Sequence, residues 1–142
     1  MKALDVAKYF VYLSHQDDTF TITPLKLQKL LYYAQGFNVL WDKKLLISEE
    51  FHAWKYGPVI PDIYDQYKIY GQKVIPVREG SNRVGTKDER ETIEAVWRDY
   101  KIYGAFELVR MTHLEDPWID AVNGNGIISN EDIIEYFENA YY

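Results

Sequence analysis

The side chains with the clearest capacity for chemistry fall in one short segment, residues 112–118. His113, Glu115 and Asp116 supply an imidazole and two carboxylates there, and Trp118 follows them. A histidine held by a carboxylate is a common general base and a common metal ligand. The structural alternative is a helix junction in which His113 and Asp116 cap helix ends while Trp118 fills the core. The segment leaves open a small metal-dependent hydrolase that uses His113, Glu115 and Asp116.

The rest of the sequence adds little to such a site. His15 and His52 are remote from His113, and no two histidines have the i, i+4 spacing that turns two imidazoles toward one metal. The eight glycines are scattered and form no phosphate-binding loop. The absence of cysteine excludes disulfides, thiolate zinc sites and cysteine nucleophiles, and it suits a reducing cytosol. We therefore expect a cytoplasmic protein that is not an enzyme and has no cofactor and no metal.

Charge and composition favour a protein partner. The net charge is −6 and no block of Lys and Arg is present, which argues against nucleic acid as a partner. No apolar run reaches the ~20 residues that a membrane-spanning helix needs, so we expect no membrane contact. The chain holds 13 Tyr, 4 Trp and 6 Phe. Aromatic side chains are enriched at interfaces, so this content favours a contact surface.

Helical signals dominate the elements that must position these residues. Thr23 and Pro24 are an N-cap and a first helical residue for a helix that is apolar on two sides and therefore central. Thr86 with Glu89 matches a capping box, and Ser129 is a further N-cap. Residues 45–60 lose the helical period and predict a short β hairpin, with a turn at Gly57-Pro58. The sequence predicts a mainly α fold, a compact bundle of about six helices with a short β hairpin, and an exposed loop over 72–85 after an extended run at 74–77.

Three segments together resemble a known family. Residues 22–36 read ITPLKLQKLLYYAQG, residues 51–61 read FHAWKYGPVIP, and residues 112–118 read THLEDPW. Their order and spacing are similar to the Panacea domain family, also described as SocA-like or phage-associated GepA-like proteins. The resemblance runs from about residue 4 to residue 137, so we expect residues 1–142 to form a single Panacea domain.

The resemblance implies a function. Members of the family are antitoxins, each of which neutralises a toxin usually encoded beside it, in bacteria or prophages. The SocA-like branch also delivers its toxin to a ClpXP-type protease as an adaptor. The resemblance therefore implies a toxin as protein partner, with direct neutralisation as the first hypothesis and proteolytic delivery as the second.

Several residues are candidates for contact with that partner. Lys26, Gln28 and Lys29 are hard to explain as packing and would line a groove beside Tyr33 and Tyr56. Glu131, Glu135 and Glu138 share one face of the last helix and could steer a basic toxin, although a solvated helix face is the default explanation for such a stripe. The complete candidate contact set is Lys26, Lys29, Tyr33, Trp54, Tyr56, His113, Glu131, Glu135 and Glu138.

Overall fold

The computed structural model describes residues 1–141 of the chain. These residues form seven α-helices, three short strands and two 3-10 segments. In chain order they are α1 Ala3–His15, α2 Pro24–Asp42, β1 Phe51–Trp54, β2 Gly57–Val59, α3 Pro61–Tyr67, η1 Lys68–Tyr70, η2 Val77–Glu79, α4 Lys87–Tyr100, α5 Ala105–His113, α6 Asp116–Val122, β3 Ile127–Ile128 and α7 Asn130–Tyr141. The fold is mainly α with a short hairpin, as the sequence predicts.

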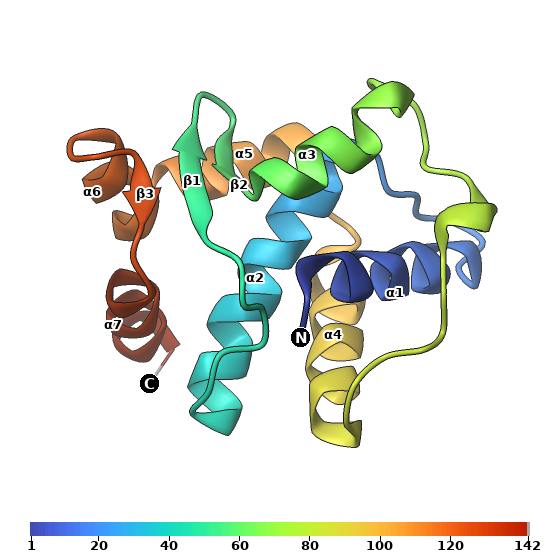
Figure 1. Ribbon diagram of the computed structural model, residues 1–142, viewed down its shortest axis with the longest axis horizontal. Helices are drawn as coiled ribbons and strands as arrows, with labels where there is room; N and C mark the ends of the chain where they lie inside the picture. The colour runs from blue at the N-terminus through green and yellow to red at the C-terminus, as the bar shows by residue number, and fades with distance from the viewer. Residues whose placement is uncertain (142) are drawn as a thin grey trace.

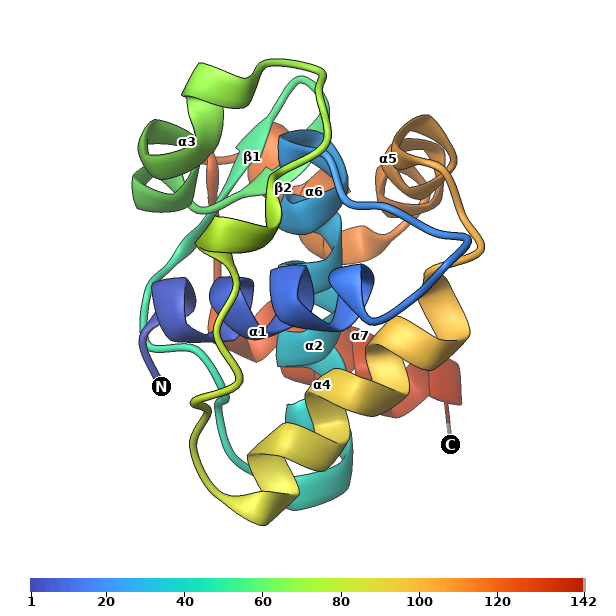
Figure 2. The same cartoon turned by 90° about the vertical axis from the view of Figure 1, so that its right-hand side faces the viewer.

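The α2 helix is the centre of the fold. Its residues 26–40 are all buried, and it packs against α1, α4, α5, α7 and β2. Figure 1 shows it in the middle of the molecule, with α1 and α4 on one side and α7 on the other. Figure 2 shows α1 crossing in front of it, next to α4. The prediction of a central helix from its two apolar sides is confirmed.

The predicted helix starts are present in the structure. Thr23 Oγ1 accepts a hydrogen bond from the Lys26 amide, and Pro24 is at the first helical position, where its missing N–H has no cost. The Thr86 and Glu89 side chains each bond the other residue's amide in a reciprocal capping box. Ser129 Oγ accepts from the Asp132 amide at the start of α7. None of the helices in the described residues is both long and apolar enough to cross a membrane.

The small sheet differs from the prediction in its details. The strand order is β2-β1-β3, all antiparallel, and Trp54 pairs with Gly57. The hairpin therefore turns at Lys55-Tyr56, and Gly57 begins β2 instead of forming the turn. Gly57 has φ +103°, and a Cβ there would lie 2.7 Å from Thr112 Oγ1, so only glycine fits. The two-residue strand β3 is too short to produce a sequence pattern.

The loop after α3 also contains a correction. Residues 74–77 do not form a strand in the described structure: the Ile75 amide bonds the Ile22 carbonyl, and Val77 begins the 3-10 segment η2. The Ile75 carbonyl in turn lies 2.8 Å from His15 Nε2, so both backbone groups of Ile75 have partners outside any strand. Ile75 is buried, whereas Val74 and Val77 are exposed. Alternating apolar residues therefore need a strand partner before they form a strand.

Candidate functional site

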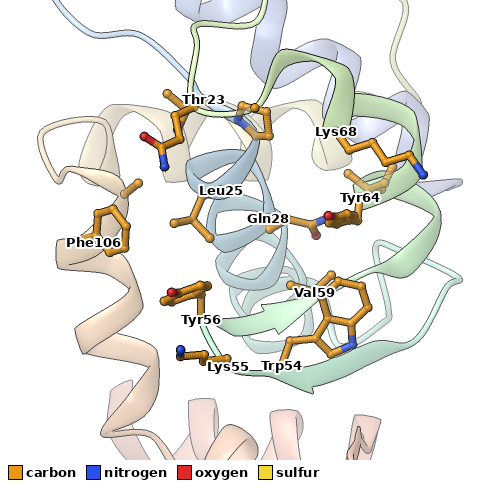
Figure 3. Close-up of a pocket in the computed structure, with 15 residues that line it drawn as sticks. Thr23, Leu25, Gln28, Trp54, Lys55, Tyr56, Val59, Tyr64, Lys68 and Phe106 are labelled. Carbon is orange, nitrogen blue, oxygen red and sulfur yellow. The ribbon is translucent and has the colours of Figure 1, made fainter.

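A groove of about 800 Å³ opens between the hairpin, α3, the start of α2 and the start of α5. Figure 3 shows its walls, with Trp54 and Val59 on the hairpin, Tyr64 on α3, Leu25 on α2 and Phe106 on α5. The lining residues are Thr23, Pro24, Leu25, Gln28, Trp54, Lys55, Tyr56, Val59, Ile63, Tyr64, Lys68, Gly71, Gln72, Ala105 and Phe106. Its volume lies within the ~300–1,000 Å³ typical of binding sites.

Four half-exposed aromatic side chains form the walls of this groove. The exposed fractions are 39% for Trp54, 47% for Tyr56, 44% for Tyr64 and 56% for Phe106. Trp54 contacts Tyr64 edge-to-face, with ring centroids 5.2 Å apart, and Tyr56 faces Phe106 at 6.1 Å. These contacts hold the rings in place while leaving much of their surface open to a partner. Large exposed apolar patches of this kind mark interaction sites.

Most of the groove lining is apolar or aromatic, with few ionisable side chains. Among the described residues that line it, the ionisable side chains are lysines and tyrosines, with no histidine, cysteine, aspartate or glutamate. The Thr23 hydroxyl therefore has no neighbouring base in the lining to activate it. The arrangement offers apolar area and a few polar anchors.

Behind the groove, α2 contributes a set of buried polar side chains. The Tyr32 and Tyr33 hydroxyls, both fully buried, donate to the two oxygens of Glu115 at 2.8 and 2.6 Å. Burial raises the pKa of the Glu115 carboxyl, and the two tyrosine hydrogen bonds oppose that rise. Burial also raises the pKa of Tyr33 far above its usual range. This carboxyl group has a structural role, because each of its oxygens accepts a hydrogen bond from a tyrosine.

Lys29 is also sealed inside the protein. Its side chain is fully buried, and its ammonium donates to the Pro58 carbonyl at 2.8 Å. Among the described residues no carboxylate forms an ion pair with it. Burial lowers the pKa of Lys29 to about 7. Lys29 therefore supports strand β2 from behind, and its pKa of about 7 lies far below the usual value for a lysine.

The glutamines of α2 bind backbone groups of neighbouring segments. Gln28 donates to the Ile60 carbonyl and accepts from the Ile60 amide, at 3.1 and 2.9 Å. Gln35 accepts from the Leu46 and Ile47 amides and donates to the Ile47 carbonyl. These side chains satisfy buried backbone groups that irregular segments cannot pair among themselves.

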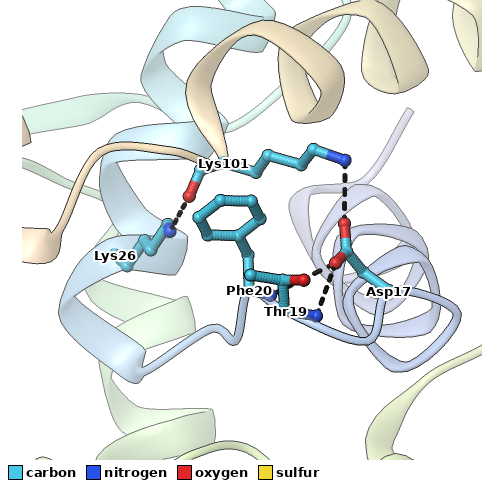
Figure 4. Close-up of polar contacts among 5 residues, drawn as sticks. All are labelled: Asp17, Thr19, Phe20, Lys26 and Lys101. Carbon is cyan, nitrogen blue, oxygen red and sulfur yellow. Dashed lines mark hydrogen bonds and ion pairs between the residues drawn. The ribbon is translucent and has the colours of Figure 1, made fainter.

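Lys26 is also buried, on the side of α2 that faces α4 (Figure 4). Its ammonium donates to the Lys101 carbonyl at 2.6 Å and lies 5.7 Å from the centre of the Trp97 ring. Burial lowers the pKa of Lys26, and the Asp17 carboxylate opposes that shift. Asp17 itself binds the Lys101 ammonium at 2.8 Å and the Thr19 amide, which lowers its pKa to about 2.

The prediction of a groove lined by Lys26, Gln28 and Lys29 beside Tyr33 and Tyr56 holds for Gln28 and Tyr56, which both line the groove. For Lys26, Lys29 and Tyr33 it is wrong. All three side chains are buried, and each binds a carbonyl or carboxylate of the protein itself. The physical reason is that loops and the hairpin bury backbone carbonyls against α2, and polar side chains are needed there to satisfy them. From the predicted set, the structure brings Trp54 and Tyr56 into the groove.

The His113–Trp118 junction holds the hairpin. His113 stacks on Trp118 with ring centroids 4.1 Å apart, and its Nε2 lies 3.0 Å from the Lys55 carbonyl. Trp118 Nε1 donates to the Trp54 carbonyl at 2.8 Å. The two rings thus fix the backbone of the turn that carries Trp54 and Tyr56. The structural alternative, in which His113 and Asp116 cap helix ends and Trp118 fills the core, is therefore wrong. His113 binds the hairpin turn, Asp116 is the first residue of α6 with Glu115 at the N-cap, and Trp118 is only partly buried.

The structure does not bring together the three side chains that the hydrolase hypothesis requires. Glu115 points to Tyr32 and Tyr33, His113 binds the hairpin, and Asp116 is exposed. The imidazole and the buried carboxylate thus have separate partners. Within residues 1–141, no group of three or more His, Cys, Asp or Glu side chains is arranged to hold a metal ion.

The acidic residues of α7 lie away from the groove. Glu131 and Glu135 are exposed and Glu138 is half-buried. Glu135 borders a smaller hollow of about 280 Å³ together with Asp116, Asp120 and Asp132. This hollow and the aromatic groove share no lining residue.

Two further aromatic walls of the groove, Tyr64 and Phe106, are not predicted from the sequence. Each lies beside its helix's core positions: Ile63 and Tyr67 are the buried residues of α3, and Leu108 and Val109 are buried in α5. An aromatic residue that falls off the core stripe of a short amphipathic helix is the signal that could have identified both.

Comparisons with known proteins agree on one family. Residues 27–119 match the model of the family described as antitoxin SocA-like, Panacea domain. Antitoxin SocA of Caulobacter vibrioides (strain NA1000 / CB15N) is 32% identical over 117 residues, covering 74% of this chain and 62% of that protein. This chain therefore spans less than two thirds of the length of that relative. No solved structure matches the chain.

Proposed function

This chain belongs to the antitoxin SocA-like family with a Panacea domain, and from that membership we propose that it neutralises a toxin by binding it directly. The antitoxin role comes from the family, whose matched region, residues 27–119, includes most of the groove and the elements behind it. The toxin is a protein, and we place both partners in the cytosol.

The observation that carries the proposal is the set of half-exposed aromatic walls around the groove. Aromatic side chains in a pocket supply most of the binding energy in many protein interfaces, because each buries a large apolar area. Trp54, Tyr56, Tyr64 and Phe106 together offer such a surface, already ordered by ring contacts. A preordered surface loses little conformational entropy on binding.

Direct binding needs no turnover by this protein. The lining residues supply apolar contact and lysine ammonium groups, and the buried carboxylate of Glu115 is bound by two tyrosines. We propose that the protein is a stoichiometric inhibitor, so the amount needed for neutralisation is proportional to the amount of toxin present.

Co-expression with the adjacent reading frames tests the proposal. We expect one of those frames to arrest growth when expressed alone and this protein to relieve the arrest. A copy of this gene with an early stop codon is the matched control, because it keeps the RNA and removes the protein. If no adjacent product is toxic, or if the intact protein relieves no arrest, direct neutralisation is wrong.

The toxin's half-life separates direct block from delivery to a ClpXP-type protease. Direct block predicts that the half-life is unchanged or longer when this protein is present, because a bound toxin is shielded. A shorter half-life that returns to normal in cells lacking the protease would replace direct block with the adaptor role.

A further inference from the structure

The charge of the groove is opposite to that of the whole chain. The chain has a net charge of −6, but Lys55 and Lys68 are the charged side chains among the described residues of the lining. Lys68 pairs with Asp65 at 3.4 Å, and both side chains are well exposed, so a partner carboxylate can replace Asp65 at little cost. Lys55 lies 5.4 Å from the centre of the Tyr56 ring.

The start of α2 adds to this positive field. Thr23, Pro24 and Leu25 line the groove, and the first turn of α2 has no acidic residue in the sequence. The amino-terminal end of a helix carries a partial positive charge, which attracts carboxylates. The groove therefore combines apolar walls with a basic rim, and it complements a segment that is apolar in its centre and acidic at its edges.

The edge of the sheet beside the groove is closed to strand addition. On β2, the Pro58 carbonyl is bound by Lys29, and proline has no N–H. Two residues further on, the amide and the carbonyl of Ile60 both form hydrogen bonds with the Gln28 side chain. An incoming strand would find no open backbone groups at these positions, so it could not extend the sheet. A partner must engage the groove through side chains, as a helix does.

We propose that the groove receives an amphipathic helix of the toxin, with apolar side chains between Trp54, Tyr56, Tyr64 and Phe106 and carboxylates beside Lys55 and Lys68. This inference rests on the proposed function and names the chemistry that the toxin presents. The volume of about 800 Å³ accommodates several side chains of one helix face.

Two groove variants and two matched controls test the proposal against the purified toxin from the adjacent reading frame. The apolar variant is Tyr56→Ala with Phe106→Ala, and its control is Trp41→Ala, an equally exposed aromatic residue outside the groove. The charge variant is Lys55→Glu with Lys68→Glu, and its control is Lys44→Glu with Lys87→Glu, two exposed lysines elsewhere. Circular dichroism and thermal unfolding check that each variant remains folded.

The expected changes differ between the two variants. The apolar variant should raise the dissociation constant about 10- to 100-fold, as loss of aromatic anchors does at other interfaces. The charge variant should raise it about tenfold in low salt and reduce or reverse its salt dependence, because exposed charges are screened. Both controls should bind within about twofold of the unmodified protein.

The outcomes separate this inference from the proposed function. If the unmodified protein binds the toxin and both groove variants bind equally well, the groove proposal is wrong and the antitoxin function stands. If the unmodified protein binds no adjacent product, the proposed function fails and this inference fails with it. A concentration-dependent dimer of the isolated chain that the apolar variant abolishes would make a second copy the occupant and overturn the proposal.

Discussion

The α2 helix borders two regions that use similar residue types in opposite ways. Toward the hairpin it borders the groove, where aromatic rings and lysines remain accessible to a partner. In the interior it presents Lys29, Tyr32 and Tyr33, which are fully buried and bound to groups of the protein itself. Tyrosine and lysine occur in both regions, so the residue type does not distinguish a contact surface from a structural network.

What separates the two regions is the partner that each polar atom already has. In the interior, each ammonium or hydroxyl satisfies a buried carbonyl or carboxylate, and its loss would leave that group unpaired. In the groove, the rings contact one another and are partly exposed, so we expect the removal of one ring to cost little stability. The comparison predicts that interior substitutions reduce stability, whereas groove substitutions reduce binding.

The largest effect on stability is expected at Glu115. Glu115→Ala leaves the Tyr32 and Tyr33 hydroxyls buried without an acceptor, which should lower the free energy of unfolding by about 3 kcal/mol. Glu115→Gln keeps one acceptor oxygen and should cost less. Urea unfolding at pH 7 measures both variants, with the exposed Asp120→Ala as control. Equal stabilities of Glu115→Ala and Asp120→Ala would show that the network does not support the fold.

Lys29 should make stability depend on pH. Its pKa is about 7 in the folded protein and about 10.4 in an unfolded chain. Between these values the unfolded state holds more protons, so stability rises with pH, by up to about 1.4 kcal/mol per unit. Relative to Lys29→Met, the unmodified protein should gain about 2 kcal/mol between pH 7 and pH 9. Parallel pH profiles of the unmodified protein and Lys29→Met would contradict a depressed pKa.

Trp118 links the two regions and should affect both. Trp118→Phe removes the hydrogen bond to the Trp54 carbonyl but retains a ring that can stack on His113. We expect a loss of about 1 kcal/mol in stability and a dissociation constant for the toxin that rises a few-fold, because the hairpin turn loosens. Thermal unfolding and titration calorimetry measure the two effects. A stability loss without any change in affinity would separate the junction from the groove.

The smallest effect is expected on α7. Reversing Glu131, Glu135 and Glu138 to lysine should slow association with a basic toxin about two- to threefold and reduce its salt sensitivity, with little change in dissociation. Stopped-flow kinetics at two salt concentrations measure the rates. Unchanged rates would indicate that these residues form only a solvated helix face.

Local signals made most of the fold predictable. Thr23-Pro24, the Thr86–Glu89 box and Ser129 each place a helix start through contacts within a few residues, and the structure contains all three. The hairpin turn was misplaced by two residues because Gly57 reads as a turn residue. Glycine is instead needed there because φ is positive and because a Cβ would collide with Lys29 and Thr112, which pack against it across the fold and which sequence spacing does not reveal.

The candidate site was predictable only in part, for the same reason. Trp54 precedes the hairpin turn and Tyr56 lies in it, so local sequence identifies both. Lys29 and Tyr33 read as accessible because their acceptors, Pro58 and Glu115, are distant in sequence. Burial of a polar side chain depends on such long-range partners. Helical periodicity alone therefore could not separate the interior from the groove.

Fluorine NMR of the protein labelled with 5-fluorotryptophan tests most directly that the groove is the contact surface. Trp54 lies in the groove and Trp41 is exposed outside it, so one spectrum contains both the probe and its control. Addition of the toxin should shift or broaden the Trp54 signal and leave the Trp41 signal unchanged, with signals assigned from single Trp→Phe variants. A shifted Trp41 signal beside an unchanged Trp54 signal would contradict the account.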